Sequence, residues 1–185
     1  MQKMKSGFPV LACFSLLLLA GCSTTNQPRL NTDIRAVRYN DLVWEHYPYP
    51  LRVEYDGKRL TLFPNEYDAN TRFFVTKNLA PKFIAAIDKY LEWEKTATER
   101  GDQITKTIDR IPYLGSRMTA RFHSGNPREH YISFGIRSPV LGDNFKIDGL
   151  SDLILDRKNA QEFRELLAKF RDGKVEIPNV DEIYR

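Results

Sequence analysis

Cysteine is scarce in this sequence of 185 residues, which contains only Cys13 and Cys22. Everything after position 22 therefore lacks disulfides, thiolate nucleophiles and cysteine-ligated metals. Histidine is almost as rare, with three residues. No HExxH pattern or matching carboxylate cluster accompanies them. We therefore expect neither a metal site nor a cofactor.

Long apolar runs are also missing after the first 20 residues. The one clear run, from Phe8 to Ala20, follows Lys3 and Lys5. It is shorter than the roughly 20 residues that a membrane-spanning helix needs. It fits the core of a secretory signal peptide, which takes about 7 to 15 apolar residues after a basic start. The sequence therefore predicts export.

The apolar run ends in the tetrapeptide Leu19-Ala20-Gly21-Cys22. This sequence resembles the lipobox of bacterial lipoproteins, whose cysteine thiol is lipidated before a peptidase cuts in front of it. The resemblance covers only the first 22 residues. It implies that residues 1–21 are a signal peptide and that Cys22 carries a diacylglyceryl thioether, usually with a third acyl chain. Two or more acyl chains hold a protein stably on a membrane.

The residue after the expected anchor is Ser23 and not Asp. In the lipoproteins that the segment resembles, Asp at this place favours retention in the inner membrane. Ser23 therefore implies a location in the cell envelope on the outer membrane, if the host is Gram-negative. Residues 22–35 are predicted to be the lipidated cysteine and a flexible polar tether.

Neither sign of charge dominates the chain. There are 28 Lys and Arg residues against 24 Asp and Glu, a net charge of +4, and removal of Lys3 and Lys5 leaves about +2. This excess is weak evidence for an anionic partner. An exported chain also meets little nucleic acid, so we expect no nucleic-acid partner.

Residues 36–185 are predicted to form one domain that begins with strands. An extended segment over 43–50 precedes a hairpin in which 51–55 and 58–63 flank Asp56-Gly57. Asp-Gly is typical of a two-residue type I′ turn. Such a turn would place Val53 opposite Leu60, and residues 72–76 are a further expected strand.

Helical periodicity follows from Leu79 to about Arg100, with Asn78 available as the cap. Residues Ile104, Ile108 and Ile111 continue the spacing of four and three, which predicts a second short helical segment. Alternating apolar residues then predict a second hairpin over 118–136, with short strands at 145–148 and 153–155. A last helix begins after Asp156 and ends at Gly173.

This order of elements predicts an α+β fold, with a mostly antiparallel sheet and two main helices packed on one face. A doubly wound parallel sheet would need a helix between most strands, and these helices are missing. No internal repeat or second domain boundary is visible.

The candidate site lies on the polar face of the second hairpin. Guanidinium groups bind phosphate and carboxylate with two parallel hydrogen bonds. This face is therefore a candidate for binding an anion or a partner. Its candidate residues are Arg117, Arg121, His123, Arg128, His130 and Arg137.

Three functions agree with these features. The leading hypothesis is a non-enzymatic binding or assembly accessory module facing the periplasm, engaging an envelope protein, lipopolysaccharide, a phospholipid headgroup or peptidoglycan. The alternative is an anchored hydrolase acting on cell-wall or lipid material through a histidine, although no serine stands in a nucleophile motif. A surface-exposed lipoprotein that contacts a host is the third possibility.

Overall fold

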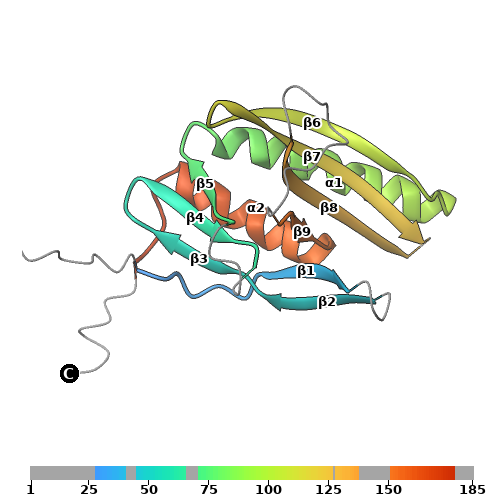
Figure 1. The fold of residues 1–185 in the computed structure, drawn as a ribbon, viewed down its shortest axis with the longest axis horizontal. Helices are drawn as coiled ribbons and strands as arrows, with labels where there is room; N and C mark the ends of the chain where they lie inside the picture. Colours follow the sequence, from blue (N-terminus) through green and yellow to red (C-terminus); the bar gives the residue numbers. More distant parts are fainter. Residues whose placement is uncertain (1–27, 41–44, 66–70, 127, 138–150, 178–185) are drawn as a thin grey trace, which may run out of the picture.

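The computed structural model describes residues 28–40, 45–65, 71–126, 128–137 and 151–177. The elements of this part of the chain are shown in Figure 1. The first strands are β1 (Arg35–Asn40), β2 (Glu45–Pro50), β3 (Arg52–Tyr55), β4 (Arg59–Phe63) and β5 (Phe73–Thr76). The remaining elements are α1 (Ala80–Arg100), β6 (Thr105–Tyr113), β7 (Ser116–Asn126), β8 (Glu129–Arg137), β9 (Leu153–Leu155) and α2 (Arg157–Arg171).

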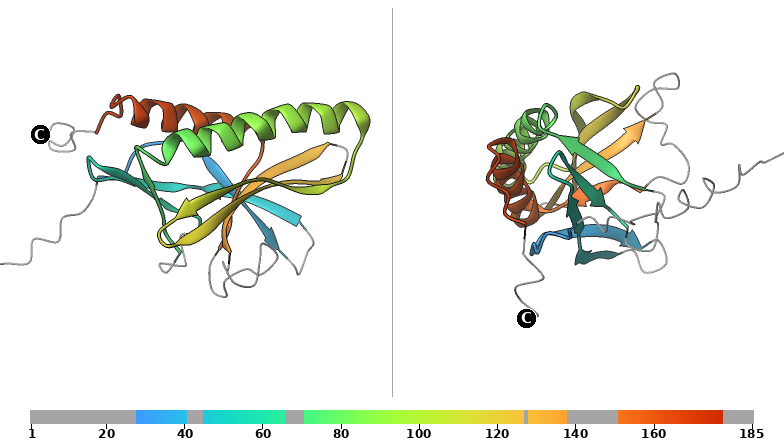
Figure 2. Two further views of the ribbon diagram at one scale, coloured as in Figure 1. Left: turned by 90° about the horizontal axis from the view of Figure 1, so that it is seen from above. Right: turned by 90° about the vertical axis from the view of Figure 1, so that its left-hand side faces the viewer.

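The strands form three antiparallel sheets, and both helices lie side by side on one side of them (Figure 2). The sheet orders are β1-β2, β3-β4-β5 and β6-β7-β8-β9. This arrangement confirms the expected α+β class with two helices on one face. The predicted hairpin and the strand Leu153–Leu155 are confirmed as β7, β8 and β9.

The core lies between the helices and the inner faces of the sheets. Phe83 of α1 stacks on Phe134 of β8 with ring centroids 4.9 Å apart, and it meets Phe163 of α2 edge-on at 6.4 Å. All three side chains are fully buried. Burial of such a ring stabilises a fold by about 1.5 to 3 kcal/mol, so these contacts tie the sheet to both helices.

The helix ends agree with the sequence at three of four termini. Asp156 caps α2 by accepting a hydrogen bond from the backbone N–H of Asn159 at 2.8 Å, and Gly101 and Gly173 adopt left-handed backbone at the helix ends. The cap of α1 corrects the prediction, because Leu79 and not Asn78 occupies the N-cap position without a side-chain hydrogen bond. A proline in the first turn, which needs no N–H there, suits this start.

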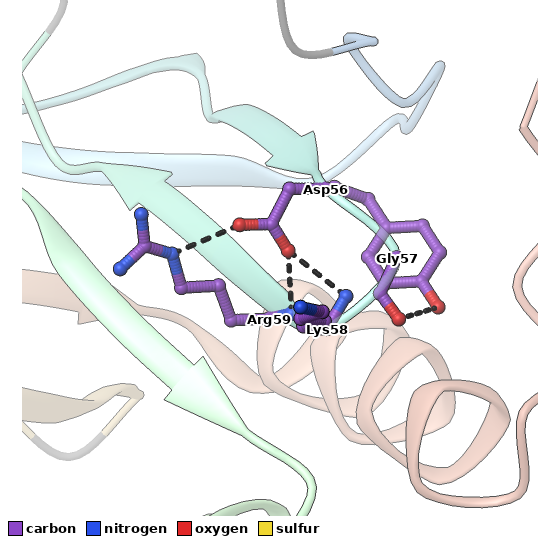
Figure 3. Close-up of polar contacts among 5 residues, drawn as sticks. Asp56, Gly57, Lys58 and Arg59 are labelled. Carbon is purple, nitrogen blue, oxygen red and sulfur yellow. Dashed lines mark hydrogen bonds and ion pairs between the residues drawn. The ribbon is translucent and has the colours of Figure 1, made fainter.

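The β3–β4 turn is longer than the predicted two residues. Tyr55 pairs with Leu60 and Val53 with Leu62, so the register is shifted by two residues and the buried face is unchanged. The Asp56 carboxylate causes the difference, because it accepts hydrogen bonds from the backbone N–H groups of Lys58 and Arg59 (2.9 and 2.8 Å; Figure 3). This Asx-type turn replaces the type I′ turn.

The predicted helical segment at residues 104–111 is wrong, because residues 105–111 belong to strand β6 and residue 104 precedes it. The pairing with β7 shifts between Thr107 and Asp109, so Ile108 is the extra residue of a β-bulge. The bulge interrupts the alternation that would have identified a strand. The spacing of four and three between isoleucines therefore imitated a helix.

The expected tether is shorter than residues 22–35. Leu30 and Ile34 are buried in the core, and the Leu30 N–H donates to the Val53 carbonyl at 2.9 Å. Two buried apolar side chains at this spacing hold residues 30–34 against the domain, so these residues are not part of a flexible tether. The predicted strand at 145–148 and the signal segment lie outside the described residues.

Within the described residues, neither helix combines the length and the hydrophobicity that crossing a membrane would require.

Candidate functional site

Alternation along β7 and β8 gives the hairpin one apolar face and one polar face. Met118, Ala120 and Phe122 point into the core, whereas Arg121 and His123 lie on the other face. Cross-strand pairing then places Arg121 opposite Ser133 and His123 opposite Tyr131. The structure thus brings two of the predicted site residues together with two hydroxyl-bearing neighbours.

These residues line an open groove of about 170 Å³ on the polar face of the β6–β9 sheet. Each strand of that sheet contributes to the groove, and β2, which belongs to another sheet, supplies one residue. The lining residues are His46, Thr105, Arg121, His123, Tyr131, Ser133, Arg137, Asp152 and Ile154.

Arg121 is the groove's main unsatisfied group. Its Nε is buried and has no hydrogen-bond partner among the described residues. A buried N–H that remains unpaired costs about 1 to 3 kcal/mol, more when it belongs to a charged group. A charged donor held in this state is an incomplete site, and an anion in the groove would complete it.

His123 lies beside Arg121 along β7. Its Nδ1 is 2.7 Å from the Thr105 hydroxyl oxygen, a contact that follows from the pairing of Thr105 with His123 between β6 and β7. Burial lowers the pKa of His123 below its ordinary value of 6.5, and the positive fields of His46 and Arg121 lower it further. The imidazole is therefore mainly neutral at pH 7.

Arg137, by contrast, is already paired. Its two terminal nitrogens donate to the two carboxylate oxygens of Asp152, at 2.9 and 2.6 Å. The side chains of Arg137 and Asp152 are only 6% and 16% exposed. This ion pair forms a neutral wall of the groove, in contrast to Arg121, whose buried Nε has no hydrogen-bond partner among the described residues.

The other three predicted site residues do not line the groove. Arg117 lies opposite Arg137 at the far end of β7, and Arg128 is exposed in the β7–β8 turn. His130 lies on the inner face, stacked on Phe122 with ring centroids 5.8 Å apart and only 4% exposed. His123 and His130 therefore point to opposite faces, which excludes a metal site shared by these two histidines.

Several residues of the groove were not predicted from the sequence. His46 of β2 packs on Tyr131 of β8 with ring centroids 4.6 Å apart, although 85 positions separate them along the chain. No local pattern announces such a contact. Tyr131 and Ser133, however, follow the same two-residue alternation in β8, so their position on the polar face could have been predicted from the sequence.

No group of three or more potential metal ligands occurs within the described residues. No protein-family model matches the sequence, and no curated protein is significantly similar to it. The geometry of the groove and the first 22 residues are therefore the basis for a functional proposal.

Proposed function

We propose that this protein is a lipid-anchored, non-enzymatic binding module of the bacterial envelope, which uses the Arg121 groove to bind an anionic group of another envelope component. The observation that supports the binding function best is the buried, unpartnered Nε of Arg121 in an open groove. A phosphate or carboxylate would supply the missing acceptor.

The surroundings of Arg121 favour an anion over a cation. Asp152, the one acidic side chain that lines the groove within the described part of the chain, is neutralised by Arg137. His123 can add a second positive charge when an anion is bound, and Ser133 and Tyr131 offer hydroxyl groups. Because these groups project from paired strands, they are held in place before the ligand arrives, which lowers the entropic cost of binding.

The anion site is tested by titration with glycerol phosphate, followed by the NMR signal of the Arg121 Nε–H. We expect that signal to shift on binding, and we expect Arg121→Gln to lower the affinity by about tenfold or more, since a charge-assisted hydrogen bond contributes about 1.5 to 3 kcal/mol. Arg128→Gln is the matched control, because it removes the same charge from the same hairpin outside the groove. Equal losses in the two variants would refute a specific site.

The lipid anchor is tested separately. Globomycin blocks the peptidase that cleaves lipidated precursors, so we expect an uncleaved, membrane-retained precursor in treated cells. Mass spectrometry of the untreated mature protein should find an acylated Cys22 at the amino terminus. A normally cleaved, soluble product in the presence of globomycin would contradict the anchor without affecting the groove.

A second candidate, an anchored hydrolase, is favoured by one observation. The Thr105 hydroxyl lies 2.7 Å from a histidine whose pKa is lowered, which resembles a nucleophile beside a general base. No carboxylate among the described residues hydrogen-bonds to His123 to orient its ring. Ester hydrolysis that disappears in both Thr105→Ala and His123→Gln would support this candidate over the binding module.

A further inference from the structure

The described chain begins at one end of the molecule, and this end is rich in exposed cations. Residues 28–30 run along β3, where the Tyr55 N–H donates to the Pro28 carbonyl at 3.1 Å and Arg29 forms a bridge with Glu54. These contacts fix the point at which the preceding segment joins the domain. That point lies beside the β3–β4 turn in Figures 1 and 2.

The C-terminal turn of α2 lies at the same end. Phe170 of α2 meets Tyr55 of β3 edge-on, with ring centroids 5.7 Å apart. A methyl group placed on Gly173 would lie 3.5 Å from Nζ of Lys77, so the β5–α1 connection is also close. We call this surface the tether end. Its exposed cations are Arg29, Lys58, Lys77, Lys169, Arg171 and Lys174.

The charges of the tether end do not cancel. Its carboxylates Asp56 and Asp172 are each paired with an arginine, Asp56 with Arg59 at 3.0 Å and Asp172 with Arg171 at 2.8 Å. The structure shows no hydrogen-bond or ion-pair partner for the ammonium groups of Lys58 and Lys169 within the described residues. Glu54, beside Arg29, is paired with Arg52, and Glu176 is a further carboxylate among the described residues at this end. These carboxylates are fewer than the exposed cations.

Chain length places this surface near the expected membrane. Five residues separate Cys22 from Pro28. An extended chain spans at most about 3.3 to 3.6 Å per residue, so the tether end lies within roughly 20 Å of the cysteine. The field of an anionic membrane extends over about one Debye length, roughly 8 Å at physiological salt. Because chain length sets only an upper limit on this distance, the tether end can approach the membrane closely enough for its cations to enter this field.

From this placement and charge, we infer that the tether end docks on the surface of an anionic phospholipid bilayer and so orients the domain. The inference rests on the proposed lipid anchor for its location. The docking surface itself uses residues separate from the Arg121 groove. Docking through lysines would add directional contacts to an anchor that by itself fixes only the distance.

The test uses the mature chain from residue 22 onward with Cys22→Ser, which has no lipid, and vesicles of phosphatidylcholine with or without phosphatidylglycerol. We expect cosedimentation with the phosphatidylglycerol vesicles only, and a loss of binding as salt rises. Each lysine near an anionic surface contributes on the order of fivefold in binding. The double variant Lys58→Glu and Lys169→Glu should therefore weaken binding by well over tenfold.

The matched control is Lys95→Glu with Lys158→Glu, which changes net charge equally at the other ends of α1 and α2 and should largely retain binding. Equal losses in both double variants, or no binding of the parent chain at low salt, would overturn the inference. If the Glu variants unfold earlier in urea, the corresponding Gln variants replace them. An unmodified Cys22 in cells would remove the anchor while the vesicle result stands.

Discussion

Arg137 donates two hydrogen bonds, at 2.9 and 2.6 Å, to the two carboxylate oxygens of Asp152 across the polar face of the β8–β9 pair. This relationship separates two arginines that look equivalent in the sequence. Arg137 forms an ion pair with Asp152 in the wall of the groove, whereas the buried Nε of Arg121 has no hydrogen-bond acceptor among the described residues. Substitutions at the two positions should therefore have different effects.

Arg137→Ala should destabilise the protein more than it weakens anion binding. The change leaves the largely buried Asp152 carboxylate without its partner, and breaking one side of such a pair costs about 3 kcal/mol or more. Urea unfolding measures the effect, with Arg128→Ala as the exposed control. A double variant, Arg137→Met with Asp152→Leu, should recover most of the loss, since it removes both charges together. Failure to recover would mean that the arginine stabilises the fold through packing instead.

Gly135→Ala should disturb the same ion pair by adding a methyl group against it. Gly135 lies in β8 directly under the two side chains, and an added Cβ would overlap the Arg137 guanidinium and the Asp152 carboxylate. We expect a loss of about 1 to 3 kcal/mol, the usual cost of overpacking. Ser133→Ala, on the same face of the same strand, should change stability by much less. A crystal structure of Gly135→Ala with an intact pair would contradict this explanation.

Leu114→Asn should stabilise the domain. Leu114 stands in the β6–β7 turn with φ of 45° and is 72% exposed, so it has a strained backbone with little burial in return. Left-handed backbone costs a leucine roughly 1 kcal/mol, and asparagine tolerates it better. Relief of about 1 kcal/mol of backbone strain should raise the midpoint of thermal unfolding by several degrees. Leu114→Ala keeps the strain and should bring no comparable gain.

Much of the fold could be predicted from the sequence, but only three of the nine residues that line the groove, Arg121, His123 and Arg137. Strict alternation along β7 and β8 identified the polar face with Arg121 and His123, and the same alternation that turns Ile132 inward also turns His130 inward. Its inner position was therefore predictable. The bulge at Ile108 was not, because one extra residue removes the two-residue period on which recognition of a strand depends.

The other groove residues could not be predicted because contacts between distant parts of the chain bring them into the groove. Asp152 meets Arg137 because β9 pairs with β8, and His46 meets Tyr131 because β2 approaches from another sheet. Neither contact follows from residues within one window of sequence. The early end of the tether was also hidden, since Leu30 and Ile34 stand alone in a polar segment and only their burial shows that they belong to the core.

The pKa of His123 predicts a pH dependence of stability. Burial, with His46 and Arg121 nearby, holds its folded pKa below 6.5, so the unfolded chain takes up this proton first as the pH falls. Stability is therefore unaffected by His123 well above pH 6.5, declines as the pH falls through that value, and levels off below the folded pKa.

Urea midpoints measured from about pH 7.5 to about pH 5 should show this decline, and His123→Gln should remove its share. Asp56 and Asp172 do not interfere, because their pKa values are lowered from 3.8 and they act at more acidic pH. A saturating anion in the groove should reverse the effect, since it stabilises the protonated imidazole beside Arg121. An identical pH profile for His123→Gln and the parent protein would show that His123 does not titrate differently in the folded state.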